Sequence, residues 1–294
     1  MAIIIDKDEV ILVQGITGKQ GAFHTGQMLA YGAKVAAGVS PGKGGQEVQG
    51  VPVYNTVAEA MENHPISATI LFIPAPGVKD AAFEAMTAGI QTLVIITEHV
   101  PLHDELDIMA YAERLGVTIV GPNTFGVISP GQSKMGIMPN RIYIPGPVGV
   151  VARSGTLSYE IAYNLTMHDL GQSTVVGLGG DRVVGLSFVE VLKRFEADPE
   201  TKVVVLVGEI GGNAEEEAAL YIKEMSKPVV AFLAGSSAPP GKRMGHAGAI
   251  IERGRGTFES KVAALTSAGA KVVSLPWEVA EQVKNILTQH RESC

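Results

Sequence analysis

Short apolar runs alternate with longer segments of helical periodicity along the first 120 or so residues. Residues 10–13, 34–39 and 68–73 are such runs and predict buried strands, because a strand covered on both faces is apolar throughout. Residues 102–115 carry apolar side chains at a helical period and predict a helix. This strand–helix alternation predicts a parallel, doubly wound sheet.

A second series of the same kind begins near residue 148. Residues 148–152, 202–207 and 228–233 predict strands, and residues 188–195 predict a helix between two of them. Residues 125–147 have many Gly and Pro and no clean period, so we predict that they connect two domains and that part of the segment is packed. The pattern therefore predicts an α/β fold of two domains, residues 1–124 and 125–294.

Glycine turns follow several of the predicted strands. Gly15-Ile16-Thr17-Gly18-Lys19-Gln20-Gly21 lies between the first strand and a helix, where free helix N–H groups can bind a phosphate. The G-x-x-G-x-x-G spacing is not the strict dinucleotide fingerprint, so a tight turn without ligand is equally compatible. The second strand runs into Ser40-Pro41-Gly42-Lys43-Gly44-Gly45, where an NAD site would need an acid. Lys43 instead favours a ligand with additional phosphate.

One histidine, His246, lies in a glycine-rich loop after the last of these strands. Gly245 and Gly248 flank it and have no Cβ, so another backbone or a phosphate can approach the ring closely. Imidazole exchanges protons near neutral pH and can also act as a nucleophile. Lys242 and Arg243, just upstream, could balance the charge of an anion. The alternative is a surface loop in which the histidine is incidental.

Composition narrows the class of protein. Hydrophobic residues make up 46% and charged residues 18%, which is typical of a globular chain, and 294 residues suffice for two cores. The net charge of −7 argues against nucleic acid as a partner. The single cysteine, Cys294, provides no disulfide, and no metal site is predicted. Without a signal peptide or a long apolar span, we expect a cytoplasmic protein that is not bound to a membrane.

Five motifs in order give the chain a close resemblance to the α subunit of succinyl-CoA synthetase, also called succinate–CoA ligase. The resemblance covers nearly the whole chain. The motifs are Gly15-Ile16-Thr17-Gly18 with Gln20-Gly21; Pro41-Gly42-Lys43-Gly44-Gly45; Ser154-Gly155-Thr156-Leu157 with Tyr159-Glu160; Gly208-Glu209-Ile210-Gly211-Gly212; and Gly241-Lys242-Arg243-Met244-Gly245-His246-Ala247-Gly248.

The resemblance implies an N-terminal Rossmann-like CoA-binding domain followed by a flavodoxin-like α/β ligase domain. It implies an acid–thiol ligase that interconverts succinate, CoA and a nucleoside triphosphate with succinyl-CoA, the diphosphate and phosphate. Coenzyme A is then a substrate. No ATP-grasp-like or Walker A sequence is visible, so we expect ATP or GTP with Mg²⁺ to bind on a partner β subunit. The sequence leaves open ATP against GTP, and an αβ against an α2β2 assembly.

The resemblance also implies roles for individual residues. His246 becomes a phosphohistidine, and Glu209 holds its other ring nitrogen. Ser154, Gly155 and Thr156 form a phosphate cradle, and Tyr159 contacts the acid substrate. The CoA-binding positions are Thr17, Gly18, Lys19, Gln20, Lys43, Ile96, Thr97 and Glu98.

The chain departs from the family pattern at a few positions. Thr124 and Phe125 replace a usual Cys-Pro, Arg182 replaces a usual Pro, and Asn140 replaces a usual Gly. These changes leave open a related ligase for malate or another short carboxylic acid. Two other classes also remain: an NAD(P)-dependent oxidoreductase, suggested by the first glycine turn, and a non-catalytic CoA-binding module.

Overall fold

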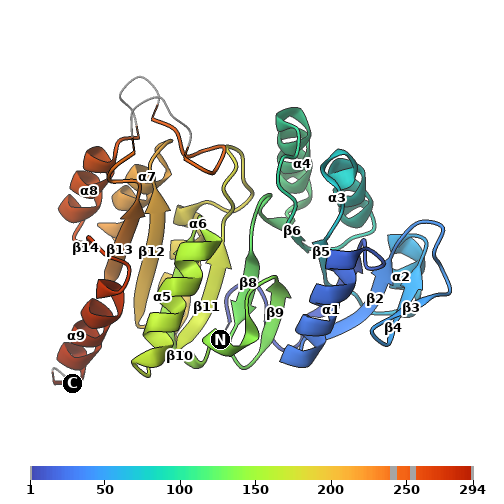
Figure 1. Ribbon diagram of the computed structural model, residues 1–294, viewed down its shortest axis with the longest axis horizontal. Coiled ribbons are helices and arrows are strands. Elements are labelled where there is room, and N and C mark those ends of the chain that lie inside the picture. The colour runs from blue at the N-terminus through green and yellow to red at the C-terminus, as the bar shows by residue number, and fades with distance from the viewer. Residues whose placement is uncertain (1, 239–243, 252–255, 293–294) are drawn as a thin grey trace.

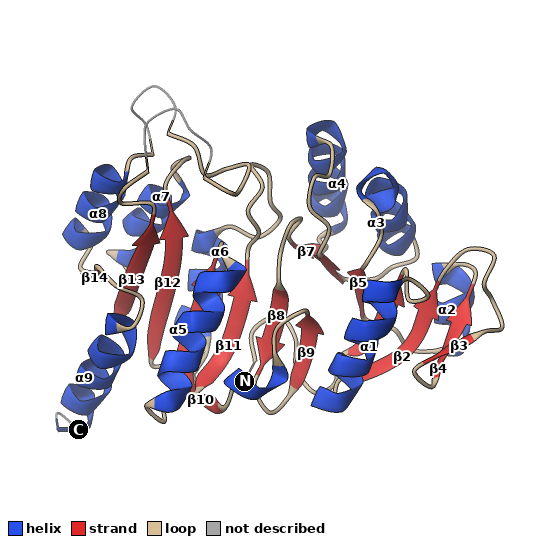
Figure 2. Ribbon diagram, in the orientation of Figure 1, coloured by secondary structure: helices blue, strands red, loops and turns tan. Residues whose placement is uncertain are grey.

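Two α/β units lie side by side in the computed structural model, which describes residues 2–238, 244–251 and 256–292 (Figure 1). Each unit is built on a seven-stranded sheet. Helices flank both sheets, and the loops at one end of the second sheet rise towards the first unit (Figure 2). This arrangement confirms the predicted fold class of two consecutive α/β units.

The first sheet has the strand order β3-β4-β2-β1-β5-β6-β7, and within it only the edge strand β3 pairs antiparallel. Its strands are β1 (Val10–Gln14), β2 (Lys34–Val39), β3 (Glu47–Val48), β4 (Val51–Tyr54), β5 (Ala68–Leu71), β6 (Thr92–Ile95) and β7 (Thr118–Val120). Its helices are α1 (Lys19–Tyr31), α2 (Val57–Asn63), α3 (Val78–Thr87) and α4 (Leu102–Leu115), with a 3₁₀ turn, η1 (Ala75–Gly77).

Successive side chains of a strand point to opposite faces, and in this sheet both faces are covered. Ile11 and Val13 of β1 pack into a core that includes Met28 of α1. Leu12, between them, packs on the other face with residues of α2, α3 and α4. Burial on both faces explains why the central strands read as continuous apolar runs in the sequence.

The second sheet has the strand order β14-β13-β12-β10-β11-β8-β9. Its strands are β8 (Gly126–Ser129), β9 (Ser133–Gly136), β10 (Pro145–Ala152), β11 (Gln172–Gly177), β12 (Val203–Glu209), β13 (Val229–Ala234) and β14 (Lys271–Val273). Its helices are α5 (Gly155–Met167), α6 (Phe188–Ala197), α7 (Ala214–Ile222), α8 (Phe258–Ser267) and α9 (Glu278–Glu292), with a 3₁₀ turn, η2 (Asn140–Ile142).

Strands β10 to β14 form the parallel part of this sheet in the order expected of a flavodoxin-like fold. Helices α5 and α9 contribute Ile161 and Val283 to the core on one face. Helices α6 and α8 contribute Phe195 and Leu265 to the core on the other face. Within the described ranges, no helix has both the length and the apolar character that crossing a membrane requires.

Residues 125–147, expected to connect the two domains with part of the segment packed, contain two strands that the sequence did not predict. Strands β8 and β9 form an antiparallel hairpin, and β8 pairs with β11 at the edge of the second sheet. A Cβ on Gly126 would lie 2.1 Å from the carbonyl oxygen of Met135, so the glycine allows the close approach of the two strands. Glycines that suggested a loop thus permit strand pairing.

The two units share a continuous apolar core, which includes Val94 and Val120 of the first sheet and Val151 and Val176 of the second. The N-terminal segment also crosses between them, because the hydroxyl of Ser129 donates to the carbonyl of residue 5 at 2.7 Å. Such packing fixes the position of one unit against the other.

A pair of buried carboxyl groups also spans the two units. Glu105 of α4 is 3% exposed, and Asp181, in the loop after β11, is 4% exposed. Burial raises the pKa of Glu105 from 4.5 to about 8, with a further contribution from its hydrogen bond to Asp181 and from the negative charge there. The protonated Glu105 therefore donates to the Asp181 carboxylate at neutral pH.

This pair predicts a pH-dependent stability. Between pH 4.5 and pH 8 the folded chain holds a proton on Glu105 that the unfolded chain has lost, so its free energy of unfolding falls as pH rises. The slope is about 1.4 kcal/mol per pH unit for one proton. Glu105→Gln keeps a hydrogen-bond donor and does not titrate, so its stability advantage over the wild type should grow across this window.

Urea unfolding at a series of pH values measures the difference. Glu113→Gln, an exposed position on the same helix, is the matched control and should give no growing difference. A constant difference between Glu105→Gln and the wild type from pH 4.5 to pH 8 would contradict the shared proton.

Candidate functional site

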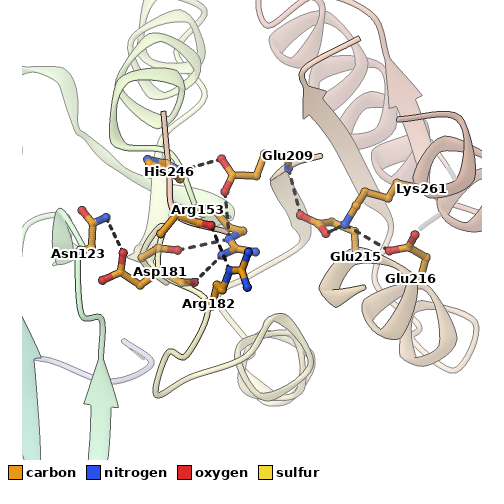
Figure 3. Close-up of polar contacts among 11 residues, drawn as sticks. Asn123, Arg153, Asp181, Arg182, Glu209, Glu215, Glu216, His246 and Lys261 are labelled. Carbon is orange, nitrogen blue, oxygen red and sulfur yellow. Dashed lines mark hydrogen bonds and ion pairs between the residues drawn. The ribbon is translucent and has the colours of Figure 1, made fainter. Parts of the chain in front are cut away.

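Polar side chains gather at the carboxyl ends of the parallel strands in the second sheet. Arg153 follows β10, Asp181 follows β11, and Glu209 is the last residue of β12. Figure 3 shows Glu209 pointing to His246, whose loop follows β13, and Arg153 pointing to Glu209, while the Asp181 side chain faces Asn123. Parallel strands end at the same edge of a sheet, so residues far apart in the sequence meet there.

His246 and Glu209 are joined by a hydrogen bond of 2.7 Å from Nδ1 of the ring to Oε2 of the carboxylate. The Glu209 side chain is only 7% exposed, whereas that of His246 is 28% exposed. This hydrogen bond is the main reason why the pKa of His246 is raised, while burial and the Arg153 charge act in the opposite direction. The carboxylate fixes the proton on Nδ1, so the lone pair of the neutral ring is on Nε2.

Arg153 supports the carboxylate from the other side. Its Nε lies 3.4 Å from Oε1 of Glu209, and both side chains are buried. Its Nη2 donates to the carbonyl of Asp181 at 2.8 Å, which ties the pair to the loop after β11. A buried ion pair needs such additional hydrogen bonds to offset the loss of hydration.

Glycines allow the histidine loop to pack closely against the loops at the strand ends. A Cβ on Gly180 would lie 2.4 Å from Cγ of His246, and one on Gly211 would lie 2.2 Å from the carbonyl oxygen of Gly248. The amide of Gly248 donates to the carbonyl of Gly180 at 3.1 Å. Larger residues at Gly180 or Gly211 would displace the ring or its loop.

Residues 154–156 open helix α5 beside this group. The Ser154 side chain caps the helix by accepting from the amide of Leu157 at 3.4 Å, and Gly155 is the first residue of the helix. In the described part of the chain, no hydrogen bond joins these three residues to His246. Arg153, directly before Ser154, makes the connection through Glu209.

Tyr159 lies one turn further along α5. Its ring packs edge-on against Phe125 at 5.7 Å between centroids. Burial raises the pKa of Tyr159 to about 12, so its hydroxyl is a hydrogen-bond donor at neutral pH.

The CoA-binding positions expected in the first unit lie at the carboxyl ends of its parallel strands. Gly18 is the residue before α1, and Lys19 and Gln20 begin that helix. Thr17 donates its hydroxyl proton to Ser40 at 3.0 Å, which joins the turns after β1 and β2.

The remaining positions lie after β6 and in the loop after β2. Thr97 donates to the carbonyl of Ile73 at 2.6 Å, between Ile96 and the exposed Glu98. Lys43 is exposed, and the amides of its two neighbours, Gly42 and Gly44, both donate to Oδ1 of Asn55 at 3.0 Å. A cavity of about 390 Å³ borders Gly44, beside Lys43.

These features fit CoA, which carries phosphates and an adenosine. The N-terminus of α1 offers free amides to a phosphate, and Lys43 offers a cation on the next loop. Gly21 is required by the turn itself, since its Cβ would lie 2.2 Å from the carbonyl oxygen of Gly15.

Two of the residues that depart from the family pattern make hydrogen bonds near the site. The Thr124 hydroxyl donates to the carbonyl of Gly177 at 2.7 Å and accepts from the amide of Gly126 at 3.0 Å. Arg182 donates from Nε to the carbonyl of Ala247 at 3.4 Å, next to His246. Lys242 and Arg243, expected to balance an anion, lie outside the described residues.

Sequence reasoning did not assign Arg153 or Gly180 to the site. Arg153 follows a predicted strand and directly precedes the Ser154 motif. That position could have indicated that Arg153 belongs to the site. Nothing in the sequence indicates that Gly180 lies under the imidazole ring.

Family profiles match both units of the chain. A family profile described as "CoA binding domain" matches residues 6–99, and one described as "CoA-ligase" matches residues 151–271. Among solved structures, ATP citrate lyase from Methanothrix soehngenii, in complex with citrate and coenzyme A, superposes with a TM-score of 0.90 at 26% identity. The match covers 98% of this chain and 51% of that one, so this chain spans about half of its length.

A dinucleotide-forming acetyl-coenzyme A synthetase from Ca. Korarchaeum cryptofilum has the same fold. Its TM-score is 0.71 at 19% identity, over 92% of this chain and 58% of that one.

Other relatives match over nearly their full length at much higher identity. The α subunit 2 of the ADP-forming succinate–CoA ligase of Archaeoglobus fulgidus is 61% identical, covering 98% of this chain and 100% of the relative. The corresponding α subunit of Methanothermobacter thermautotrophicus is 59% identical over 96% of both chains. That of Aquifex aeolicus is 52% identical over 98% of this chain and 95% of the relative. The chain therefore belongs to the family of succinate–CoA ligase α subunits.

Proposed function

We propose that this chain is the CoA-binding, phosphoryl-carrying α subunit of an ADP-forming succinate–CoA ligase that acts with a β subunit. The observation that carries the proposal is the hydrogen-bonded pair of His246 and the buried Glu209, with the His246 ring packed against Gly180. The relatives that match over nearly their full length are named as α subunits of ADP-forming succinate–CoA ligases.

The chemistry follows from the free nitrogen of His246. With Nδ1 held by Glu209, Nε2 attacks the γ-phosphorus of ATP; an N–P bond forms and the bond to the bridging oxygen of ADP breaks. A carboxylate oxygen of succinate then takes the phosphoryl group and frees Nε2. The CoA thiolate attacks the acyl carbon of this acyl phosphate, and phosphate leaves.

Several groups on this chain support these steps. Glu209 stabilises the ring as its charge changes, and Arg153 keeps the carboxylate in place. The N-terminus of α5 at Ser154, Gly155 and Thr156 offers amides and the positive end of the helix dipole to the phosphoryl group. We assign Tyr159 to the carboxylic acid as a hydrogen-bond donor.

We also propose a division of labour between the two units. Residues 1–124 bind CoA through Thr17, Gly18, Lys19, Gln20, Lys43, Ile96, Thr97 and Glu98. Residues 125–294 carry the phosphoryl chemistry, and the β subunit supplies the nucleotide with Mg²⁺.

A nicotinamide oxidoreductase is less compatible with the site. The strand that would supply the ribose-binding acid ends at Val39, and the next residue, Ser40, accepts from Thr17. A ligase for malate or another short acid remains the second candidate, because Arg182 borders the histidine loop where the family has proline.

His246→Asn should abolish phosphorylation and lower turnover by about a thousandfold or more, because it removes the nucleophile. The complex with the β subunit is incubated with ATP labelled on the γ-phosphate. Label on the wild type should be lost in mild acid and kept in alkali, as expected of a phosphoryl group on nitrogen. His103→Asn, an exposed position on α4, is the control and should keep both activities. Turnover by His246→Asn near the wild-type rate would disprove the mechanism.

Lys43→Ala should weaken CoA binding about tenfold, through the loss of a charge-assisted phosphate contact. Calorimetry with CoA and with dephospho-CoA separates the phosphates. The loss should be smaller with dephospho-CoA if Lys43 binds the 3′-phosphate. Equal affinity of both ligands for both proteins would exclude that contact.

Succinate should be the best substrate in a panel of short dicarboxylates assayed with the β subunit. We expect its kcat/KM to exceed that of malate by about tenfold or more, since a site that excludes a hydroxyl gains at least this discrimination. A higher kcat/KM for malate would favour the second candidate and would leave the phosphohistidine chemistry unaffected.

A further inference from the structure

The amide of Glu209 has an unusual partner. It donates to Oε1 of Glu215, in the first turn of α7, at 3.0 Å. Neighbouring strand β10 pairs with β12 only as far as Ala152 and Val207, and the chain then leaves the sheet. The carboxylate of Glu215 thus takes the place of a strand carbonyl beside the last residue of β12.

Glu215 is itself held by a buried lysine. Lys261 of α8 and Glu215 are both 0% exposed and form an ion pair and hydrogen bond. Lys261 also lies 3.3 Å from Oε2 of Glu216. Figure 3 shows the series of side chains from Lys261 through Glu215 to Glu209 and His246.

Gly208 makes room for this link. A Cβ at Gly208 would lie 2.7 Å from both Cγ and Oε1 of Glu215. A glycine directly before Glu209 therefore lets the carboxylate pass close to the strand and reach the amide.

We propose that Lys261 and Glu215 are positioning residues, which fix the end of β12 so that the Glu209 carboxylate meets Nδ1 of His246. A buried ion pair is a poor source of stability, because an apolar pair of similar volume often does as well. Here the ion pair instead holds an oxygen of Glu215 where it can accept a hydrogen bond from the amide of Glu209. Arg153 acts on Glu209 directly, whereas Lys261 acts only through Glu215.

The proton affinity of His246 reports the position of Glu209. Among the described residues, three charged groups act on the imidazole: Glu209 and Asp181 favour its protonated form, and Arg153 opposes it. Because the hydrogen bond to Glu209 is the largest of these influences, a misplaced Glu209 should lower the pKa of His246. A purely structural role of Lys261 would leave the pKa unchanged in a folded variant.

Two double variants separate the hydrogen bond from the ion pair. E215L/K261M removes both charges, so no unpaired charge stays buried, and it also removes the acceptor. E215Q/K261M removes the same charges but keeps an oxygen that can accept from the Glu209 amide. E216Q is the matched control, because Glu216 contacts Lys261 and, in the part of the chain that the structure describes, forms no hydrogen bond or ion pair with Glu209.

The imidazole of His246 is titrated by NMR in the 294-residue chain, with H246N to assign the signal and E209Q as the reference for a lost carboxylate. The pKa should fall towards the E209Q reference in E215L/K261M. It should stay near that of the wild type in E215Q/K261M and E216Q. A wild-type pKa in folded E215L/K261M would overturn the proposal.

G208A provides a second test of the proposal if E215L/K261M does not fold. It retains all charges and displaces Glu215 by the added Cβ, so the pKa should again fall; a wild-type pKa in folded G208A would overturn the proposal. A second readout, the rate of label transfer from ATP with the β subunit, rests on the proposed function. Absence of label in the wild type would reject that function, while the titration would still decide the positioning role.

Discussion

The carboxylate of Glu209 is the group on which the rest of the site depends. One of its oxygens accepts from His246, and the other pairs with Arg153. Three features place this buried charge between its two partners. Strand β12 ends at Glu209, and Asp181, in the loop after β11, accepts a hydrogen bond from Arg153. The histidine loop packs directly against Gly180. The position of the ring thus depends on the end of β12 and on two separate loops.

A large part of this arrangement could be predicted because parallel sheets bring strand ends together. Apolar runs located the central strands, and the motifs after them placed Ser154, Glu209 and His246 at one edge of the second sheet. The same reasoning placed Thr17 and Lys43 at one edge of the first sheet. The end of such a strand can be located in a sequence because the continuous run of apolar residues stops where the chain is no longer covered on both faces.

The contacts that support these residues could not be predicted. Lys261 lies in a helical segment where lysine is normally exposed, and only the fold shows that Glu215 lies beside it. From the sequence, Glu215 is an acid in the first turn of a helix, where the helix dipole favours it. The sequence does not indicate that its carboxylate also accepts a hydrogen bond from the Glu209 amide. The hairpin of β8 and β9 was missed because its glycines also suit a loop. Each of these features depends on a partner distant in the sequence, and no local pattern encodes the partner.

The link between the two units follows from Asp181. Its carbonyl accepts from Arg153, and its carboxylate accepts from Asn123, which follows the first sheet. The same carboxylate accepts a hydrogen bond from the protonated Glu105 on α4. One residue therefore connects the interface between the units to the guanidinium that holds Glu209. Asp181 thus links the contacts with the first unit to Arg153, which in turn pairs with the carboxylate that orients His246.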